Sequence, residues 1–382
     1  MDRNGFSDRA TGRLVPTIGG RKAFVAAPLP PTITVERFLP ELTRATQAVG
    51  ELKGIGRTVS NSLLLVRPLQ RREAVSSSSM EGTYTTLTDL FLFEAGDNDA
   101  AVRGDTREVA NYVRALEGAI GGLADLPIST RLIRDAHRVL LTGVARHRGA
   151  SVDAGELKRD QNWIGGGGRI DSARFIPAPP SETPDALDRL MGFINREQRP
   201  APLIDAALAH YQFEAIHPFA DGNGRVGRML ITLMLIDNGT LPQPLLYVSP
   251  YLERHKDRYI DLMYGVSRDG AWEDWIAFFL DAVTASAEET IAVVERLQDL
   301  QREYRERFQT ARRSALMLRI IDLAFERPVQ SITTFADALG VSYGGAQNNV
   351  RELIAQGVAE EVEGSYPKLI RFPGVMAALQ MG

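Results

Sequence analysis

Residues 217–228 read HPFADGNGRVGR, and this stretch is the most informative part of the chain for both fold and chemistry. The tripeptide at 222–224 stands between an irregular segment and a helix, where glycines let the backbone approach a ligand and the helix N-terminus presents N–H groups. Arg225 and Arg228 are three residues apart, so they project from one helical face and suit two phosphates of one polyphosphate. The stretch therefore predicts a phosphate-binding loop that leads into a helix.

Two further residues of the stretch add chemistry to this loop. Asp221 is a hard oxygen ligand of the kind that Mg²⁺ takes when phosphate oxygens complete its shell. His217 directly precedes Pro218, which ends the preceding helix, and a neutral imidazole there can accept a proton from an attacking hydroxyl. Together these residue types predict a site that binds and cleaves a nucleotide polyphosphate.

The composition is that of an ordinary globular protein. The chain has 382 residues, 44% of them apolar and 24% charged, with a formal net charge of −4 that gives no general attraction to nucleic acid or anionic membrane. No cysteine is present, which excludes disulfides, thiolate catalysis and cysteine-zinc sites. The N-terminus lacks the apolar core of a signal peptide, and the apolar run at 229–236 is too short to span a bilayer. A cytoplasmic protein is expected, with no membrane partner.

The hydrophobic pattern is mostly helical before residue 311. Residues 1–34 are rich in Gly and Pro and are expected to form an extended arm, followed by a helix from about Thr34 to Gly50 and further helical patterns to about Val144. The pattern breaks at 161–180, QNWIGGGGRIDSARFIPAPP, which predicts a β-hairpin with an extended exit. More helices are expected at 184–196, 203–216, 229–236, 251–267 and 271–308.

The character of the chain changes from about Ala311. Residues 315–325, 331–339 and 343–356 have helical periodicity, and Lys368 to Phe372 look like a strand after a polar turn. Three short helices followed by a β-hairpin is the order of a winged helix-turn-helix.

HPFADGNGRVGR resembles the signature of the Fic family, HxFx(D/E)GNGRxxR, at every defining position. The resemblance implies a mainly α fold, a Fic-type helical bundle with a β-hairpin flap, to which the C-terminal winged helix-turn-helix is added. It implies three parts. Residues 1–110 would form an N-terminal arm and a helical region with an inhibitory helix, residues 111–310 the catalytic core, and residues 311–382 the winged helix-turn-helix. The activity implied is transfer of the AMP moiety of ATP, with Mg²⁺, to a hydroxyl side chain of a target protein.

The family's roles carry over by position within the signature. His217 would be the general base on the target hydroxyl, Asp221 would hold Mg²⁺, and Phe219 would be buried as the anchor of the loop. The residues that would bind the phosphates are Gly222, Asn223, Gly224, Arg225 on the β-phosphate and Arg228 on the γ-phosphate.

Two flanking segments extend the resemblance. GELKRDQNWIGGG at 155–167 is similar to the family's flap, which would hold the target chain by strand addition, so that the target docks on 161–180. Ile164, Gly165 and Gly166 would then flank the nucleotide, whereas the last two glycines of the run fit a flexible hairpin tip. YVSPYLERHKDRY at 247–259 resembles the helix that closes the adenine pocket, with Tyr259 against the base and Ile260 where relatives often have a second tyrosine.

A control element is indicated upstream. SSSMEG at 77–82 resembles the family's inhibitory motif, [S/T]xxxE[G/N], with Ser77, Glu81 and Gly82 at the defining positions. The same pattern also fits a helix capping box. In the inhibitory interpretation Glu81 pairs with Arg228 and occupies the space that the γ-phosphate needs.

The C-terminal segment carries too little positive charge to favour DNA binding. Between 311 and 372, seven basic residues balance seven acidic ones. Amide side chains at Gln347, Asn348 and Asn349 could read adenine edges, but attraction to phosphates would be weak. We therefore favour a protein-interaction or target-positioning module over DNA binding.

The first interpretation is thus an autoinhibited protein adenylyltransferase. Its rivals are a hydrolase that removes AMP, with Glu81 orienting water, and a transcription regulator that uses the Fic core as a nucleotide sensor. An intact His217 favours an enzyme, because binding phosphate does not require a base there. The nucleotide base, the target protein, self-modification and a homodimer all stay open at this stage.

Overall fold

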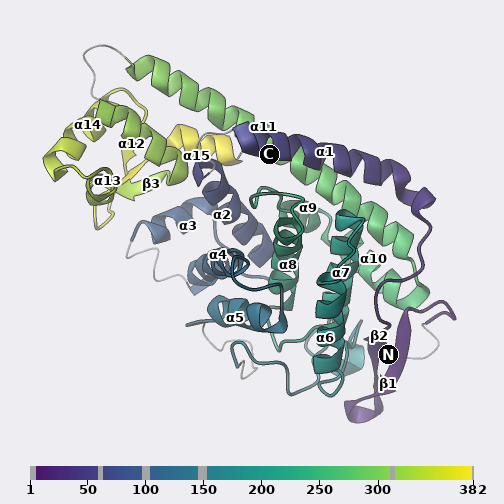
Figure 1. Ribbon diagram of the computed structural model, residues 1–382. Helices are drawn as coiled ribbons and strands as arrows, with labels where there is room; N and C mark the ends of the chain where they lie inside the picture. Colours follow the sequence, from purple (N-terminus) through teal and green to yellow (C-terminus); the bar gives the residue numbers. More distant parts are fainter. Residues whose placement is uncertain (1–5, 59–62, 97–103, 145–152, 310–314, 381–382) are drawn as a thin grey trace. The chain divides into compact units, whose positions relative to one another are not determined.

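The computed structural model describes residues 6–58, 63–96, 104–144, 153–309 and 315–380 (Figure 1). It is mainly helical, which confirms the mainly α fold expected from the sequence. None of the helices in these ranges combines the length and the hydropathy that a membrane span requires.

The chain forms two compact units. The first comprises Met1–Glu51 and Asn111–Ser286, and the second comprises Leu52–Ala110 and Ala287–Gly382. Three helices contribute residues to both units: α1 (Leu39–Thr58), α4 (Gly104–Gly122) and α11 (Trp272–Phe308). The three-part division expected from the sequence stays a prediction, and its boundary between 310 and 311 lies outside the described residues.

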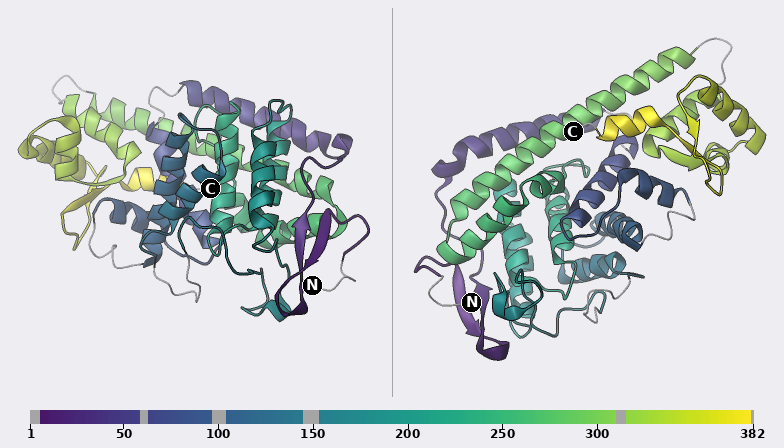
Figure 2. Two further views of the ribbon diagram at one scale, coloured as in Figure 1. Left: turned by 60° about the horizontal axis from the view of Figure 1, so that its bottom comes forward. Right: turned by 180° about the vertical axis from the view of Figure 1, so that it is seen from behind.

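The signature connects two central helices of the first unit and forms the start of the second helix. They are α7 (Pro202–Ile216) and α8 (Asn223–Asp237), which run side by side in Figures 1 and 2. Almost every residue of both helices is buried, as expected of helices that are apolar on all sides. The helices around them are α5 (Thr130–Leu140), α6 (Thr183–Ile194), α9 (Ser249–Arg254) and α10 (Lys256–Asp269). The helix expected at 251–267 is thus two helices, which meet at His255.

The N-terminal segment is not the extended arm expected from its glycines and prolines. It forms an antiparallel pair, β1 (Gly12–Pro16) and β2 (Lys22–Ala26), joined through a short 3-10 turn, Ile18–Gly20 (Figure 2). Gly19 and Gly20 both have positive φ, which a turn between strands requires. Phe24 is fully buried, and its N–H donates to the carbonyl of Ile176 at 2.8 Å, so tertiary contacts stabilise the pair.

The hairpin expected at 161–180 is reduced to a single antiparallel bridge between Ile164 and Phe175. A 3-10 turn, Ile170–Ser172, lies between them. A Cβ on Gly166 would lie 2.5 Å from the Ser172 backbone, so the tight return of the chain depends on glycine there.

The second unit contains α2 (Leu63–Ser79), α3 (Leu87–Glu94) and the C-terminal elements. The latter are α12 (Ala315–Glu326), β3 (Val329–Ser331), α13 (Ile332–Leu339), α14 (Tyr343–Ala355), β4 (Glu360–Glu361), β5 (Leu369–Arg371) and α15 (Pro373–Gln380). The strands form one antiparallel sheet in the order β3-β5-β4. Ser331 and Ser342 cap α13 and α14 by accepting from Thr334 N and Gly345 N. The three helices α12, α13 and α14 and the strand β5 agree with expectation, whereas the sequence did not predict α15. The assignment of these elements as a winged helix-turn-helix stays a prediction.

Candidate active site

The loop between α7 and α8 has a left-handed residue at each end. His217, the C-cap of α7, has φ 51° and ψ 60° and is the one non-glycine residue with positive φ among those the structure describes. Gly222, the N-cap of α8, has φ 78° and ψ 6°. A left-handed histidine is strained, and such strain persists only where the surroundings enforce it, often at a functional site.

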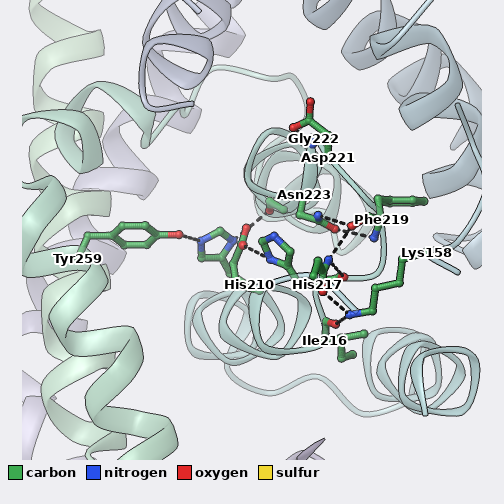
Figure 3. Close-up of polar contacts among 12 residues, drawn as sticks. Lys158, His210, Ile216, His217, Phe219, Asp221, Gly222, Asn223 and Tyr259 are labelled. Carbon is green, nitrogen blue, oxygen red and sulfur yellow. Dashed lines mark hydrogen bonds and ion pairs between the residues drawn. The ribbon is translucent and has the colours of Figure 1, made fainter. Parts of the chain in front are cut away.

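Side chains within the loop fix its shape. Asn223 accepts the N–H of Phe219 and donates to the carbonyl of the same residue, both at 2.8 Å (Figure 3). Asp221 Oδ1 accepts the N–H of Gly222 at 2.6 Å. The side chain of Asn223 is therefore engaged within the loop, which leaves its backbone as the part suited to a phosphate.

The two arginines of the signature lie on the buried face of α8. Arg225 is completely buried, and Arg228 is 2% exposed. The Arg225 guanidinium lies 3.7 Å from Asp221 Oδ1, whereas the Asp221 side chain remains 31% exposed. Two buried cations beside a helix N-terminus make this end of α8 strongly attractive to an anion.

Asp221 fits a magnesium ion that arrives with a nucleotide. One of its oxygens is occupied by Gly222 N, and its side chain is open enough to take a further ligand. The described residues contain no group of three or more His, Cys, Asp or Glu side chains that could hold a metal. One accessible carboxylate is the donor set that Mg²⁺ uses when substrate phosphates and water supply its other ligands.

A lysine and an asparagine outside the signature also hold the loop. Lys158 Nζ donates to the carbonyl of Ile216 at 3.0 Å and to Asn162 Oδ1 at 2.9 Å (Figure 3). Asn162 Nδ2 donates to the carbonyls of His217 and Phe219 at 3.1 and 2.9 Å. Burial lowers the pKa of Lys158 to about 7, and the neutral amine still has the two N–H donors that these contacts need.

His137 holds the other side of the loop. Its Nε2 lies 2.9 Å from the carbonyl of Asp221, and its Nδ1 accepts the N–H of Gly155 at 2.8 Å. Sequence reasoning did not single out His137, Lys158 or Asn162, because their role depends on contacts with a loop 55 to 84 residues away. Lys158 and Asn162 do lie within the flap segment at 155–167, and this position was the sequence feature that could have identified them as residues of the site.

The flap residues and Tyr259 occupy defined positions in the first unit. Ile164 forms the single bridge with Phe175, and Gly165 and Gly166 follow it with positive φ. Tyr259 is 7% exposed, and its hydroxyl lies 2.9 Å from His210 Nε2, toward which it points in Figure 3. Contact of any of these four residues with a nucleotide stays a prediction.

The segment with the inhibitory resemblance ends α2 in the second unit. Ser77 is fully buried in the last turn, Glu81 N donates to the carbonyl of Ser78 at 3.0 Å, and Gly82 has φ 79°. The serine run therefore ends a helix rather than beginning one, which removes the capping-box interpretation. The effect of Glu81 on Arg228 stays a prediction.

Comparison with known families agrees with this arrangement. A family model described as "Fic/DOC family N-terminal" matches residues 39–121, and one described as "Fic/DOC family" matches residues 127–235. The two models together cover just over half of the chain.

Several proteins of known name or structure are similar to parts of the chain. A protein adenylyltransferase Fic from Culex quinquefasciatus is 32% identical over 132 residues, which are 34% of this chain and 23% of that protein. A probable protein adenylyltransferase from Aquifex aeolicus is 35% identical over 94 residues, 25% of this chain and 27% of that one. The chain thus spans about a quarter of the length of these relatives. A crystal structure of a Fic family protein from Desulfovibrio desulfuricans superposes with a TM-score of 0.56 at 21% identity, over 90% of this chain and 97% of that one.

Proposed function

The chain belongs to the Fic/DOC family, and on that premise we propose that it is a protein adenylyltransferase, which moves the AMP moiety of ATP to a hydroxyl of a target protein. Relatives named protein adenylyltransferase support this activity. Ser, Thr and Tyr are the side chains that offer such a hydroxyl.

The observation that carries the proposal is the loop of residues 217–222. It places a histidine at the end of one helix and a glycine at the start of the next, and the first two turns of that second helix carry two buried arginines. A proton acceptor beside an anion site is what transfer to a hydroxyl requires, whereas a site that only binds phosphate has no need of the base.

The reaction follows from these roles. His217 accepts the proton of the target hydroxyl while its oxygen forms a bond to the α-phosphorus of ATP. The bond between that phosphorus and the oxygen bridging to the β-phosphate breaks, and pyrophosphate leaves. The backbone N–H groups at the start of α8, together with Arg225 and Arg228, hold the phosphate oxygens as negative charge develops on them.

Asp221 is the residue that would hold Mg²⁺. When bound, the ion would neutralise phosphate oxygens and so favour departure of pyrophosphate. The accessible Asp221 carboxylate supports this assignment.

The flap supplies the docking segment for the target. Its described backbone forms one antiparallel bridge, at Ile164 and Phe175, and an extended target segment can continue such pairing by strand addition. Strand addition recognises main chain, so it can hold a hydroxyl near His217 without requiring a particular neighbouring side chain.

The activity is held low by Glu81. In this proposal its carboxylate pairs with Arg228 and takes the space of the γ-phosphate, so that ATP cannot bind in the productive pose. The support is the position of Glu81 at a helix end in a motif that matches the family's inhibitory pattern, together with the buried state of Arg228.

The test uses Glu81→Gly protein with ATP labelled on either the α- or the γ-phosphate. Protein-bound label from the α position alone, abolished by His217→Ala, is the expected result. Label from the γ position would instead indicate phosphoryl transfer. If an AMP-modified protein loses its label on addition of the wild-type chain, the direction of the reaction is removal.

A further inference from the structure

Glu214 lies on the last turn of α7, three residues before His217, and is outside the signature. Its Oε2 is 3.5 Å from His217 Nδ1, and the two side chains are 12% and 19% exposed. We propose that Glu214 is the positioning residue of the site: its carboxylate holds the imidazole through Nδ1, so that Nε2 faces the target hydroxyl as the proton acceptor. This role rests on the proposed function, because it needs His217 to act as the base.

The backbone of His217 is fixed, but its ring needs a partner of its own. The N–H donates to Phe213 O at 2.8 Å, and the carbonyl accepts from Asn162 Nδ2 at 3.1 Å. Among the described residues, the carboxylate within 4 Å of this ring is that of Glu214. A separation of 3.5 Å is long for a hydrogen bond, and catalytic contacts of this kind tighten when substrate binds.

The surroundings of Glu214 keep its carboxylate ionised. Burial by itself would raise the pKa of Glu214, but the contact with His217 and the nearby charge of Arg228 lower it. The groups that face the carboxylate are thus His210 and His217 on its own helix and Arg228 on α8. Tyr259 on α10 reaches it through His210. An anion beside Nδ1 favours the tautomer with the proton on Nδ1 and the lone pair on Nε2.

His210 does not compete with His217 for this carboxylate. Its Nδ1 lies 3.1 Å from the carbonyl of Gly227 and must donate there, because a carbonyl only accepts (Figure 3). Its Nε2 therefore accepts from the Tyr259 hydroxyl. Burial lowers the pKa of His210, so both of its nitrogens are engaged in the neutral state.

The space that Glu214 occupies depends on Gly227. A Cβ added to Gly227 would lie 2.5 Å from Glu214 Oε1 and 3.1 Å from Phe213. Any larger residue at 227 must push the carboxylate aside, since the far end of the Glu214 side chain is the part able to move. The structure thus offers a second, indirect way to separate the pair.

The direct test is Glu214→Gln in the Glu81→Gly background, with Glu214→Asp as the conservative variant. For Glu214→Gln we expect kcat to fall roughly 10- to 100-fold with the KM for ATP little changed, because only the orientation of the base is lost. Glu214→Asp should restore part of the rate.

A second readout does not depend on activity. The chain has five histidines, so the ring nitrogen signals can be resolved by NMR and assigned with His217→Ala. The His217 ring should carry its proton on Nδ1 in the parent. The share of the tautomer with the proton on Nε2 should rise in Glu214→Gln and in Gly227→Ala, but not in Gly192→Ala, a helical glycine with open space around its Cβ.

The outcomes separate the two proposals. An unchanged His217 tautomer and an unchanged kcat in Glu214→Gln would overturn the positioning role, even if the protein transfers AMP. A changed tautomer in a protein that transfers no AMP would retain the Glu214–His217 pair and overturn the proposed function. Equal thermal unfolding temperatures of Glu214→Gln and its parent would show that the variant keeps the fold. If Glu214→Gln unfolds at a lower temperature, Gly227→Ala tests the Glu214–His217 contact in its place.

Discussion

The imidazole of His137 lies flat against the ring of Phe219, with the ring centroids 3.8 Å apart and the planes 7° from parallel. Both residues are completely buried, and the same imidazole contacts the Asp221 carbonyl through Nε2. Because that carbonyl only accepts and Nδ1 accepts from Gly155, the ring is neutral with its proton on Nε2. His137 is thus the buried support on which the loop of the active site rests.

This support should make the stability of the protein sensitive to acid. Burial lowers the pKa of His137 to about 4, whereas an unfolded histidine titrates near 6.5. Between these values the unfolded state binds more protons, so the stability contributed by this group is lost as the pH falls from about 6.5 to about 4. Between pH 7 and pH 5 the loss should be about 2 kcal/mol, measured by urea unfolding.

The matched variants are His137→Gln and His255→Gln. His255 is exposed, so its replacement should leave the pH dependence of unfolding as it is in the wild type. His137→Gln should unfold more readily at pH 7 and lose less further stability at pH 5. A pH dependence that is identical in all three proteins would show that His137 is not the acid-sensitive group.

Lys158 should matter for both stability and rate. Lys158→Met removes the donors to Ile216 O and Asn162 Oδ1, leaving a buried carbonyl unsatisfied at a cost of about 1–3 kcal/mol. Without Lys158 the Asn162 side chain is no longer held in place. Because Asn162 donates to the His217 carbonyl, kcat should also fall. Thermal unfolding and AMP transfer would be compared with Lys256→Met, at an exposed position. Equal behaviour of the two variants would contradict a role for Lys158 in holding the loop.

The sequence was sufficient where structure follows local pattern. The apolar run at 229–236 predicted a buried helix, which α8 confirms. The spacing of Arg225 and Arg228 extended the expected helix back toward the loop. Its start at Asn223 depends on the left-handed Gly222 and on the bond between Asn223 and Phe219, which periodicity does not show. The break of the helix near His255 similarly follows from a local backbone angle rather than from residue type.

Elements stabilised by distant partners escaped prediction. The strands β1 and β2 sit among glycines and prolines, and Phe24 contacts Ile176 and Phe175 from elsewhere in the chain. The candidate site shows the same division. The signature identified the residues of the loop itself, whereas His137, Lys158 and Glu214 act through contacts that no short motif encodes.

Inhibition by Glu81 should weaken when the ion pairs that hold α2 within the second unit are broken. Helix α2 packs against α12, and Arg67 and Arg72 of α2 form ion pairs with Glu326 and Glu289. If α2 must be held for Glu81 to act, Glu289→Gln should raise AMP transfer about fivefold, from loss of roughly 1 kcal/mol of restraint.

The control for this effect is Asp299→Asn, which removes an exposed ion pair with Arg302 on α11. That variant should leave the rate unchanged. In the Glu81→Gly background, Glu289→Gln should have no further effect, because the inhibitory carboxylate is already gone. A fivefold rise in that background as well would show that the ion pair acts by another route.

The C-terminal elements should bind DNA weakly. Two of their basic residues are paired with acids, since Lys368 Nζ lies 2.6 Å from Glu361 and Arg371 pairs with Glu360. Little positive charge is then left for phosphates, in line with the balanced charge of residues 311–372. A gel shift with genomic fragments should show no retention at physiological salt. Retention that weakens steeply as salt rises would instead establish these elements as a DNA-binding module.

If His217 and the loop of residues 217–222 transfer AMP to a protein hydroxyl, the modified protein gains the mass of one adenylyl group. Mass spectrometry of Glu81→Gly protein, incubated with MgATP and a cell lysate, measures this gain. We expect it on a Ser, Thr or Tyr of a protein in the mixture, or of the chain itself, and we expect His217→Ala to prevent it. An absence of any such gain, or a gain that persists in His217→Ala, would show that His217 does not transfer AMP.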